Sequence, residues 1–153
     1  MIAKEKLNIL WSLEQTAEKY ADRVAVSDVN QELTWKELVK KAQVIGAELS
    51  EKVQPGNPVP VLLEKSSETL AVMLGIVYAG CFYVPVNPMN PTERLRKIME
   101  KLDPEVIISD EKGKEQLAAV GNGLENKVMG PEALTLPREV DYDTHIDHAF
   151  RCG

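Results

Sequence analysis

The sequence lacks an excess of positive charge, a pair of neighbouring cysteines and an uninterrupted hydrophobic run. Its formal net charge of -6 argues against nonspecific binding to nucleic acid or to an anionic membrane, because either partner would repel the chain. Cys81 and Cys152 lie far apart, so we expect a reduced, cytoplasmic protein. The longest apolar stretch, residues 70–86, is broken by glycines and ends in a proline-rich turn, which does not predict a membrane span. No secretory signal is visible at the amino terminus.

Motifs for phosphate binding and covalent catalysis are absent as well. The sequence contains neither G-x-G-x-x-G nor G-x-x-x-x-G-K-[ST], the glycine-rich patterns that hold phosphates. Neither cysteine has the neighbours that a catalytic nucleophile needs, and we expect Cys81 to be a small core residue. No catalytic residue and no cofactor-binding residue is therefore assigned to this chain.

One group of potential metal ligands occurs near the carboxyl terminus. Its members are Asp143, His145, Asp147, His148 and Cys152. Histidine, cysteine and carboxylate side chains are the groups that bind zinc. These residues occupy the least regular part of the sequence, so we predict no metal site there.

The composition is that of a folded domain. Hydrophobic residues make up 44% of the chain and charged residues 27%, as in ordinary globular proteins. A length of 153 residues suffices for one domain with a substantial core and is short for two. The hydrophobic pattern ends at Gly130, so we predict an α/β unit over residues 1–130 and an irregular tail over 131–153.

Hydrophobic spacing predicts alternating helices and strands. Helices are predicted over 8–20, from the Thr34 cap through Leu49, and over 68–79, 93–102 and 114–120. Strands are predicted over 24–26, 32–33, 59–63, 82–86, 106–108 and 127–129, the first two as a hairpin. Because helices and strands alternate with short loops, we predict a mostly parallel sheet with right-handed crossovers and helices on both faces.

Three positions carry clear signals for the ends of helices. Thr34 and Glu37 have the spacing of a capping box, in which each side chain satisfies a backbone N–H of the other. Asn90 is predicted to cap a helix whose first residue is Pro91, with Glu93 reaching back. Gly80 suits the left-handed position that follows a helix.

The stretch from residue 69 to 86 is predicted to organise the fold. Residues 69–78 are apolar around almost the whole helix, and Gly80 joins them to the apolar strand 82–86. This pattern predicts a helix and a strand buried at the centre of an α/β layer. We expect the aromatic side chains of Trp35, Tyr78 and Tyr83 to serve packing rather than base stacking, given the acidic charge.

Ligands of open α/β sheets usually bind beyond the carboxyl ends of the strands. In this sequence those ends are 64–66, 87–88 and 109–110. Ser66 and Ser67 begin a helix, where free N–H groups favour an anion such as phosphate. No glycine-rich loop accompanies them, so simple capping by Ser66 or Ser67 is the preferred interpretation.

Two stretches resemble signatures of adenylate-forming enzymes, particularly the amino-acid adenylation domains of nonribosomal peptide synthetases and the D-alanine–carrier-protein ligases. Residues 33–38 (LTWKEL) resemble the motif Leu-Thr/Ser-Tyr-x-Glu-Leu. Residues 78–88 (YAGCFYVPVNP) resemble the motif Lys-Ala-Gly-x-x-Tyr-Val-Pro-Ile-Asp-Pro. Further similar segments follow in family order: 22–26, 62–66, 91–95 and 107–110. The resemblance covers about residues 8–112.

Two positions depart from these signatures. Tyr78 stands where the family usually has lysine, and Asn87 stands where amino-acid-activating enzymes mostly have aspartate. The sequence Val-Asn-Pro is closer to that of some acyl-CoA ligases. On balance the resemblance favours an amino-acid or D-alanine type of substrate over a fatty acid.

The resemblance implies an ATP- and Mg²⁺-dependent parent enzyme. Such an enzyme condenses a carboxylate with ATP to an acyl-adenylate and pyrophosphate, then passes the acyl group to the thiol of a carrier protein or of coenzyme A. The family's phosphate loop, substrate pocket, ribose- and magnesium-binding acidic residues and mobile carboxy-terminal domain have no counterpart in these 153 residues. We therefore expect an incomplete amino-terminal portion of the large domain, ended by experimental design, gene truncation or a frame change. This portion is expected to bind no cofactor and to have no activity alone.

Two further hypotheses concern the chain as it stands. In the alternative hypothesis, the chain is a standalone, non-catalytic α/β module that binds a nucleotide or a partner protein. Truncation would also expose the apolar helix 69–78 or a sheet edge, and exposed apolar area and open edges favour self-association. We therefore predict a homodimer or higher oligomer.

Overall fold

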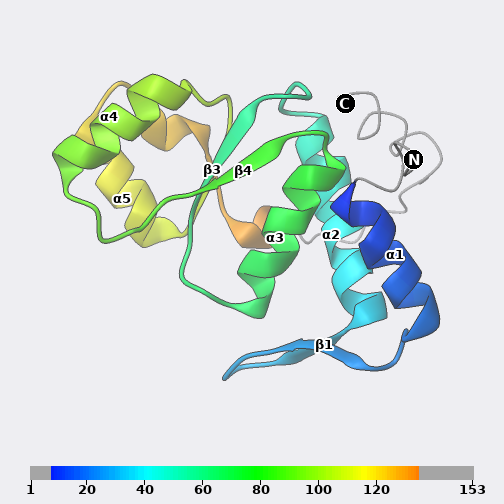
Figure 1. Ribbon diagram of the computed structural model, residues 1–153. Helices are drawn as coiled ribbons and strands as arrows, with labels where there is room; N and C mark the ends of the chain where they lie inside the picture. The colour runs from blue at the N-terminus through cyan, green and yellow to red at the C-terminus, as the bar shows by residue number, and fades with distance from the viewer. Residues whose placement is uncertain (1–7, 135–153) are drawn as a thin grey trace.

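A four-stranded parallel sheet lies at the centre of the structure, a computed structural model that describes residues 8–134 (Figure 1). Its strands lie in the order β4 (Phe82–Pro85), β3 (Pro58–Leu62), β5 (Ile107–Ser109) and β6 (Val128–Met129). Every adjacent pair is parallel. The prediction of a mostly parallel α/β sheet is confirmed.

Helices cover both faces of this sheet (Figure 1). They are α1 (Ile9–Lys19), α2 (Trp35–Ser50), α3 (Ser67–Tyr78), α4 (Thr92–Leu102) and α5 (Glu111–Val120). Helices α2 and α3 form one layer with α1 packed beside them, and α4 packs with α5 on the opposite side. The order and type of the predicted helices are confirmed.

The two central strands present apolar side chains on both faces of the sheet. Adjacent side chains of a strand point to opposite faces. Val61 and Ile108 belong to the core shared with α2 and α3, whereas Leu62 and Ile107 belong to the core shared with α4 and α5. All four side chains are buried. Strands β3 and β5 therefore join two hydrophobic cores, as parallel strands between helical layers do.

A separate antiparallel hairpin precedes the sheet. Its strands are β1 (Val24–Ser27) and β2 (Glu32–Thr34), with Val26 opposite Leu33. In Figure 1 the hairpin extends away from the layers below α2. The predicted hairpin is confirmed.

Two of the three predicted helix-end signals are confirmed. The Oγ1 atom of Thr34 accepts a hydrogen bond from the Glu37 backbone N at 3.3 Å, and the Glu37 carboxylate accepts one from the Thr34 backbone N at 2.8 Å. Gly80 has a φ of 74°, the left-handed conformation that glycine adopts without strain. This turn lets the chain reverse from α3 directly into β4.

The predicted cap of α4 is wrong by one residue. Pro91, and not Asn90, is the cap, and no side chain bonds to the first turn. The first helical hydrogen bond runs from Leu95 N to the Pro91 carbonyl at 3.0 Å. Glu93 therefore occupies the second helical position, one residue too early to complete a capping box.

The strand predicted at the buried centre of the sheet lies instead at its edge. Strand β4 pairs only with β3 among the described strands, and Phe82 and Tyr83 are 51% and 41% exposed. Tyr83 is thus partly exposed at the sheet edge, whereas Tyr78 is buried and Trp35 packs against the core from its border. Helix α3 is largely buried, as predicted.

Pro60 occupies a position in β3 that needs no backbone donor. Hydrogen bonds from Phe82 N to the Asn57 carbonyl and from Val86 N to the Val61 carbonyl show that odd-numbered residues of β3 face β4. The nitrogen of Pro60 therefore faces β5, whose pairing with β3 begins only at Val61. A proline is tolerated in this central strand for that reason.

Some predicted boundaries shift in the structure. Helix α5 begins at Glu111 rather than Lys114, because Asp110 caps it. Short 3₁₀ turns, η2 (Leu124–Lys127) and η3 (Pro131–Leu134), were not predicted. Leu134 is fully buried and lies in the core beside α2 and α3, so ordered structure continues past Gly130. The division at residue 130 stays a prediction, since residues 135–153 lie outside the described part.

Candidate functional site

The carboxyl ends of β3, β4 and β5 meet at one edge of the sheet. These strands are adjacent and parallel, so the residues that follow them lie along the same side. The structure thus brings together the segments 64–66, 87–88 and 109–110 that the sequence predicts as ligand-binding ends. This edge is the candidate functional site.

Two polar side chains at this edge hold their own loops. Asn87 accepts a hydrogen bond from Met89 N at 2.8 Å and so closes the turn after β4. Asp110 accepts one from Gly113 N at 2.8 Å and caps α5. Ser109 is buried, and its hydroxyl donates to the Asp110 carbonyl at 3.1 Å. These groups shape the edge and do not point to a bound ligand.

The start of α3 is filled by a carboxylate from the protein itself. The Ser66 hydroxyl caps the helix by accepting from Thr69 N at 3.1 Å, which confirms the predicted cap. Ser67 N donates to Asp28 Oδ2 at 2.8 Å, and the Ser67 hydroxyl donates to the same oxygen at 2.7 Å. Asp28 belongs to the hairpin turn, 39 residues earlier in the chain. The N–H group that a phosphate would use is therefore bonded to an internal anion.

These bonds keep Asp28 ionised. The hydrogen bond from the Ser67 hydroxyl lowers the pKa of Asp28 most, and the backbone N–H groups of Ser67, Asn30 and Gln31 lower it further. All four donors stabilise the charged form, so this pKa lies far below the usual range of an aspartate. The helix start is thus occupied by a negative charge at neutral pH.

A second contact ties the same corner together. The Lys41 ammonium forms an ion pair with the Glu68 carboxylate, which joins α2 to the first turn of α3. Gln31 Nε2 donates to the same Glu68 oxygen at 3.4 Å. The hairpin, α2 and α3 are therefore held at one point by side chains from all three elements.

Two charged side chains at the edge remain available. Glu64 and Lys65 follow β3, are exposed, and make no side-chain hydrogen bond or ion pair within residues 8–134. They are the charged groups of the predicted strand ends that a ligand or an adjoining segment can reach. Two such groups alone do not make a catalytic centre.

The cysteine and the potential metal ligands considered in the sequence do not contribute to this edge among the described residues. Cys81 is buried in the core, and its thiol donates to the Gln54 carbonyl at 3.4 Å, so its predicted packing role is confirmed. The potential zinc ligands, Asp143, His145, Asp147, His148 and Cys152, lie outside the described residues. Within residues 8–134 no three histidine, cysteine or carboxylate side chains are grouped to hold a metal ion.

The full role of Asp28 could not be predicted from the sequence. Segment 28–31 is predicted as a turn, and Asp28 does close that turn by accepting from Asn30 N and Gln31 N. Its second oxygen reaches a helix far along the chain, and no local pattern indicates that contact. The signal available was the free oxygen that an aspartate keeps after closing a turn.

No helix between residues 8 and 134 combines the length and the hydrophobicity needed to cross a membrane.

Comparisons with known proteins point to one family. The family model described as AMP-binding enzyme matches residues 13–145. Bacitracin synthase 1 of Bacillus licheniformis is 37% identical over 107 residues, which cover 69% of this chain and 2% of that protein. The chain therefore spans only a small part of this curated relative.

Solved structures resemble the fold over most of this chain. A structure of VinN with 3-methylaspartate has 25% sequence identity and a TM-score of 0.73, and the match covers 91% of this chain and 36% of that one. The Klebsiella oxytoca NpsA N-terminal subdomain in complex with 3-hydroxybenzoyl-AMSN has 22% identity and a TM-score of 0.72, over 87% of this chain and 33% of that one. At this identity the second match supports the fold alone.

Proposed function

This chain belongs to the AMP-binding enzyme family, and from that premise we propose that it is the amino-terminal part of an adenylate-forming ligase. In the proposed parent reaction a carboxylate oxygen attacks the α-phosphorus of ATP, pyrophosphate leaves, and an acyl-adenylate forms. A thiol then attacks the acyl carbon and AMP leaves. The observation that carries this proposal is the family match over residues 13–145, which extends across both cores of the structure.

The proposed substrate of the parent enzyme is an amino acid or a similar carboxylate. This proposal is supported by the similarity to a bacitracin synthase and to VinN, which was solved with 3-methylaspartate. The proposed acceptor is the thiol of a carrier protein, with coenzyme A as the second candidate. ATP and Mg²⁺ belong to this proposal as the cosubstrate and metal of the parent enzyme.

We expect this chain alone to be inactive. Adenylation requires donors and a metal ion preorganised around the triphosphate. At the described strand ends only Glu64 and Lys65 carry charged side chains without a protein partner, and the α3 start holds Asp28 instead of a phosphate. Amino-acid-dependent exchange of ³²P-pyrophosphate into ATP should therefore stay at background for the 153-residue chain. Exchange above that of a heat-denatured control would show the expectation to be wrong.

The alternative, a standalone nucleotide-binding module, makes a different prediction. A module of that kind would bind ATP or AMP saturably at the carboxyl edge of the sheet. Isothermal titration of the chain with each nucleotide separates the two proposals, because the ligase fragment is expected to give no saturable heat. Saturable binding that is lost in the Lys65→Ala variant and kept in a Lys97→Ala variant would favour the module.

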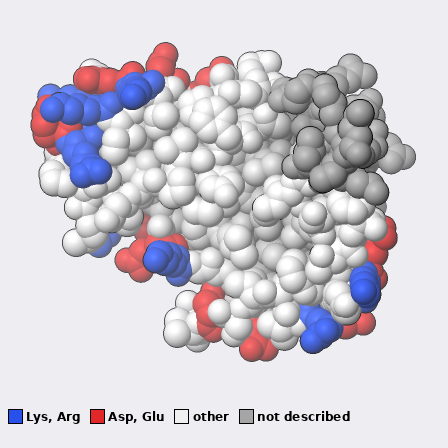
Figure 2. Space-filling view, viewed as in Figure 1, with Lys and Arg blue, Asp and Glu red and all other residues white. Residues whose placement is uncertain are grey.

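We also propose that the chain self-associates through the edge strand β4. Figure 2 shows a broad uncharged surface over β3, β4 and α3, with charged side chains gathered near α4 and at the opposite end of the view. Since Phe82 and Val86 bond to β3, the backbone N–H and C=O of Tyr83 point outward, away from the sheet. The side chains of Phe82, Tyr83 and Met89 lie in or next to this edge, and they are 51%, 41% and 74% exposed. An edge of this kind favours pairing with another strand.

Sedimentation velocity over a range of concentrations tests this association. The chain should form a dimer or larger species, and Tyr83→Lys should shift it toward monomer, because a charge on an edge strand opposes pairing. Val29→Lys is a matched control, since Val29 is 99% exposed on the hairpin turn. A chain that remains monomeric at every concentration would contradict the proposal.

A further inference from the structure

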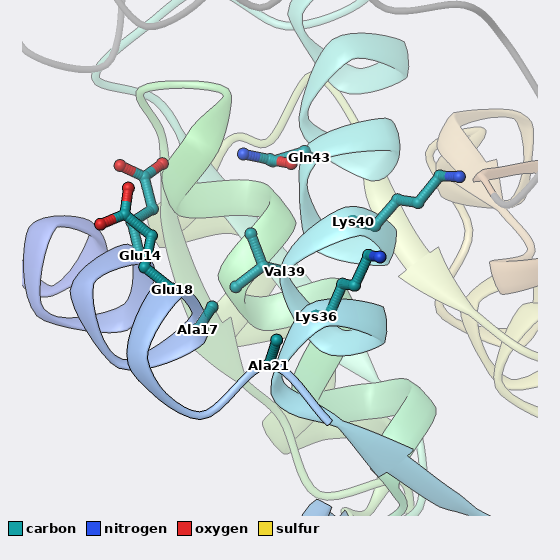
Figure 3. Close-up of a pocket in the computed structure, with 8 residues that line it drawn as sticks. All are labelled: Glu14, Ala17, Glu18, Ala21, Lys36, Val39, Lys40 and Gln43. Atoms are coloured by element: carbon teal, nitrogen blue, oxygen red, sulfur yellow. The ribbon is translucent and has the colours of Figure 1, made fainter. Parts of the chain in front are cut away.

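A groove between α1 and α2 has an apolar floor of small side chains (Figure 3). Its volume is about 600 Å³. The floor is formed by Ala17 and Ala21 from the α1 end and by Val39 from α2, and the buried Val39 anchors it to the core. Small residues here keep the two helices from filling the space between them, so another backbone can approach closely.

One rim of this groove is acidic. Glu14 and Glu18 lie one turn apart on α1 and stand on the same side of the floor in Figure 3. The Tyr78 hydroxyl donates a hydrogen bond to Glu14 Oε1 at 2.7 Å. This bond from α3 fixes the direction of the Glu14 carboxylate at the rim.

The opposite rim is basic. Lys36 and Lys40 lie one turn apart on α2 and stand across the floor from the two glutamates (Figure 3). Among the described residues neither lysine forms an ion pair, although two carboxylates line the same groove. The next residue, Lys41, faces α3 and is paired with Glu68. The lysines of α2 that form no ion pair among the described residues are thus the two that line the groove, and in Figure 3 their side chains extend away from Glu14 and Glu18.

The rims are therefore charged, opposite in sign and too far apart to neutralise each other. Each rim also carries two like charges on successive turns of one helix, which opposes helix formation slightly. A ligand that places complementary charges on both rims would remove this cost. Electrostatic complementarity of this kind directs binding and sets orientation.

The spacing of the charges indicates the shape of that ligand. Glu14 and Glu18 are four residues apart, as are Lys36 and Lys40, so the charges repeat at about 6 Å along each rim. Side chains on one face of a strand repeat at roughly 6.7 Å, which fits this spacing less well. An α-helix lying along the groove has the same repeat as both rims.

We propose that this groove binds an α-helix of a partner protein. The helix carries lysine or arginine on successive turns along the edge that meets Glu14 and Glu18. It carries aspartate or glutamate along the edge that meets Lys36 and Lys40, with small apolar residues between. The apolar stripe rests on Ala17, Ala21 and Val39, and the two charged edges fix the direction in which the helix lies.

A designed peptide tests this proposal on the complete chain. The probe is an alanine-based helix of roughly 20 residues, long enough to be helical, with lysines on successive turns of one edge and glutamates on the other. With a fluorescent label, its binding is followed by fluorescence anisotropy at low salt. We expect saturable binding at one site per chain that weakens as ionic strength rises.

Variants of each rim should weaken binding to a similar degree. Glu14→Gln with Glu18→Gln, or Lys36→Gln with Lys40→Gln, removes two ion pairs and should raise the dissociation constant roughly tenfold. Glutamine at position 14 can still accept the Tyr78 hydrogen bond, so the fold is preserved. Lys97→Gln with Lys101→Gln, a like-charged pair on α4, is the matched control and should change nothing.

Reversing both rims provides a stricter test. The variant Glu14→Lys, Glu18→Lys, Lys36→Glu, Lys40→Glu should regain the affinity for the same peptide, because a helix that lies in the opposite direction exchanges its two edges. A peptide with lysines on both edges should bind less tightly than the probe to the native chain. Equal affinity for the two peptides, or unchanged affinity in both rim variants, would overturn the proposal. So would rim variants that alter the sedimentation of the chain instead, since the occupant would then be a second copy.

Discussion

Asp28 connects the hairpin to the helical layer through a single side chain. One oxygen accepts from Asn30 N at 2.7 Å and from Gln31 N at 3.0 Å, which closes the turn between β1 and β2. The other oxygen accepts both hydrogen bonds from Ser67 at the start of α3. Asp28 is the acceptor in all four bonds, and an ionised carboxylate accepts hydrogen bonds more strongly than a neutral group does.

The first prediction concerns the pH dependence of this contact. The pKa of Asp28 in the folded chain lies far below its ordinary value of 3.8, so its contribution is fully present above that ordinary value and is lost as the pH falls toward the folded-state pKa. Asp28→Asn should therefore lower the urea midpoint at pH 7. The difference between the native chain and the variant should shrink below pH 3.8. Urea unfolding followed by circular dichroism at neutral and acidic pH measures both effects.

Glu64→Gln is the control for this prediction. Glu64 is also an exposed carboxylate near α3, but its side chain makes no hydrogen bond or ion pair within the described residues. Its substitution should leave the urea midpoint almost unchanged at both pH values. A difference for Asp28→Asn that stays constant from neutral to acidic pH would show that its charge does not stabilise the fold.

Helices α2 and α3 approach each other closely because each presents a glycine at the contact. A Cβ atom at Gly75 would lie 2.4 Å from Ile45 Cγ2, and one at Gly46 would lie 2.5 Å from Tyr78 Cβ. Neither separation is possible between real atoms, so any side chain at these positions must move the helices apart. Among the described elements, α2 and α3 contact each other most extensively, and they do so within the core that contains Val61 and Ile108.

Gly75→Ala should therefore destabilise the chain although alanine favours a helix. The expected loss is about 1–3 kcal/mol of unfolding free energy, as for other overpacked cores, and it exceeds the helix-propensity gain of about 1 kcal/mol. Ile45→Ala removes the nearest clashing atom, Cγ2, and keeps the Ile45 Cβ atom, which would lie 2.6 Å from the new Cβ atom, so it relieves part of the clash. The double variant Ile45→Ala, Gly75→Ala should thus lose less stability than the sum of the single losses. Additive losses in denaturant unfolding would argue against the close approach of the two helices.

Elements formed by contacts between neighbours in the sequence could be predicted, and their arrangement in space could not. Thr34 and Glu37 are three residues apart, so their spacing predicted the capping box directly. Asn90 and Pro91 are both acceptable caps by local pattern, and in the structure Pro91 is the cap. The exposure of Tyr83 follows from the strand order, which no hydrophobic period encodes.

The candidate site shows the same division. The strand ends that form it could be predicted because parallel strands place their carboxyl ends on one side. The hydrogen bonds from the start of α3 to Asp28 could not be predicted, since they join residues that are 39 positions apart in the chain. The resemblance to adenylate-forming enzymes predicted the family correctly, because ordered motifs at matching spacing are a long-range signal that local periodicity lacks.

At the scale of the whole molecule, one sheet joins two hydrophobic cores. The core shared by α4 and α5 is closed by Leu117, Val120 and Leu124. The core shared by α2 and α3 is closed in part by Leu134, which lies beyond the last strand and is fully buried. The end of the described chain is therefore part of the packed structure and not an appendage to it.

The last prediction concerns the contribution of η3 to the core. Because η3 contacts both α2 and α3, removing the Leu134 side chain should open a cavity in the core shared with these two helices. Leu134→Ala in the complete chain should cost about 2–5 kcal/mol of unfolding free energy. A chain that ends at residue 130 should lose at least as much stability relative to one that ends at 134, because it lacks the same side chain and its backbone. Glu132→Ala, which alters an exposed side chain of the same turn, should have a much smaller effect. If the chains that end at 130 and 134 unfold at the same urea concentration, the core does not need η3.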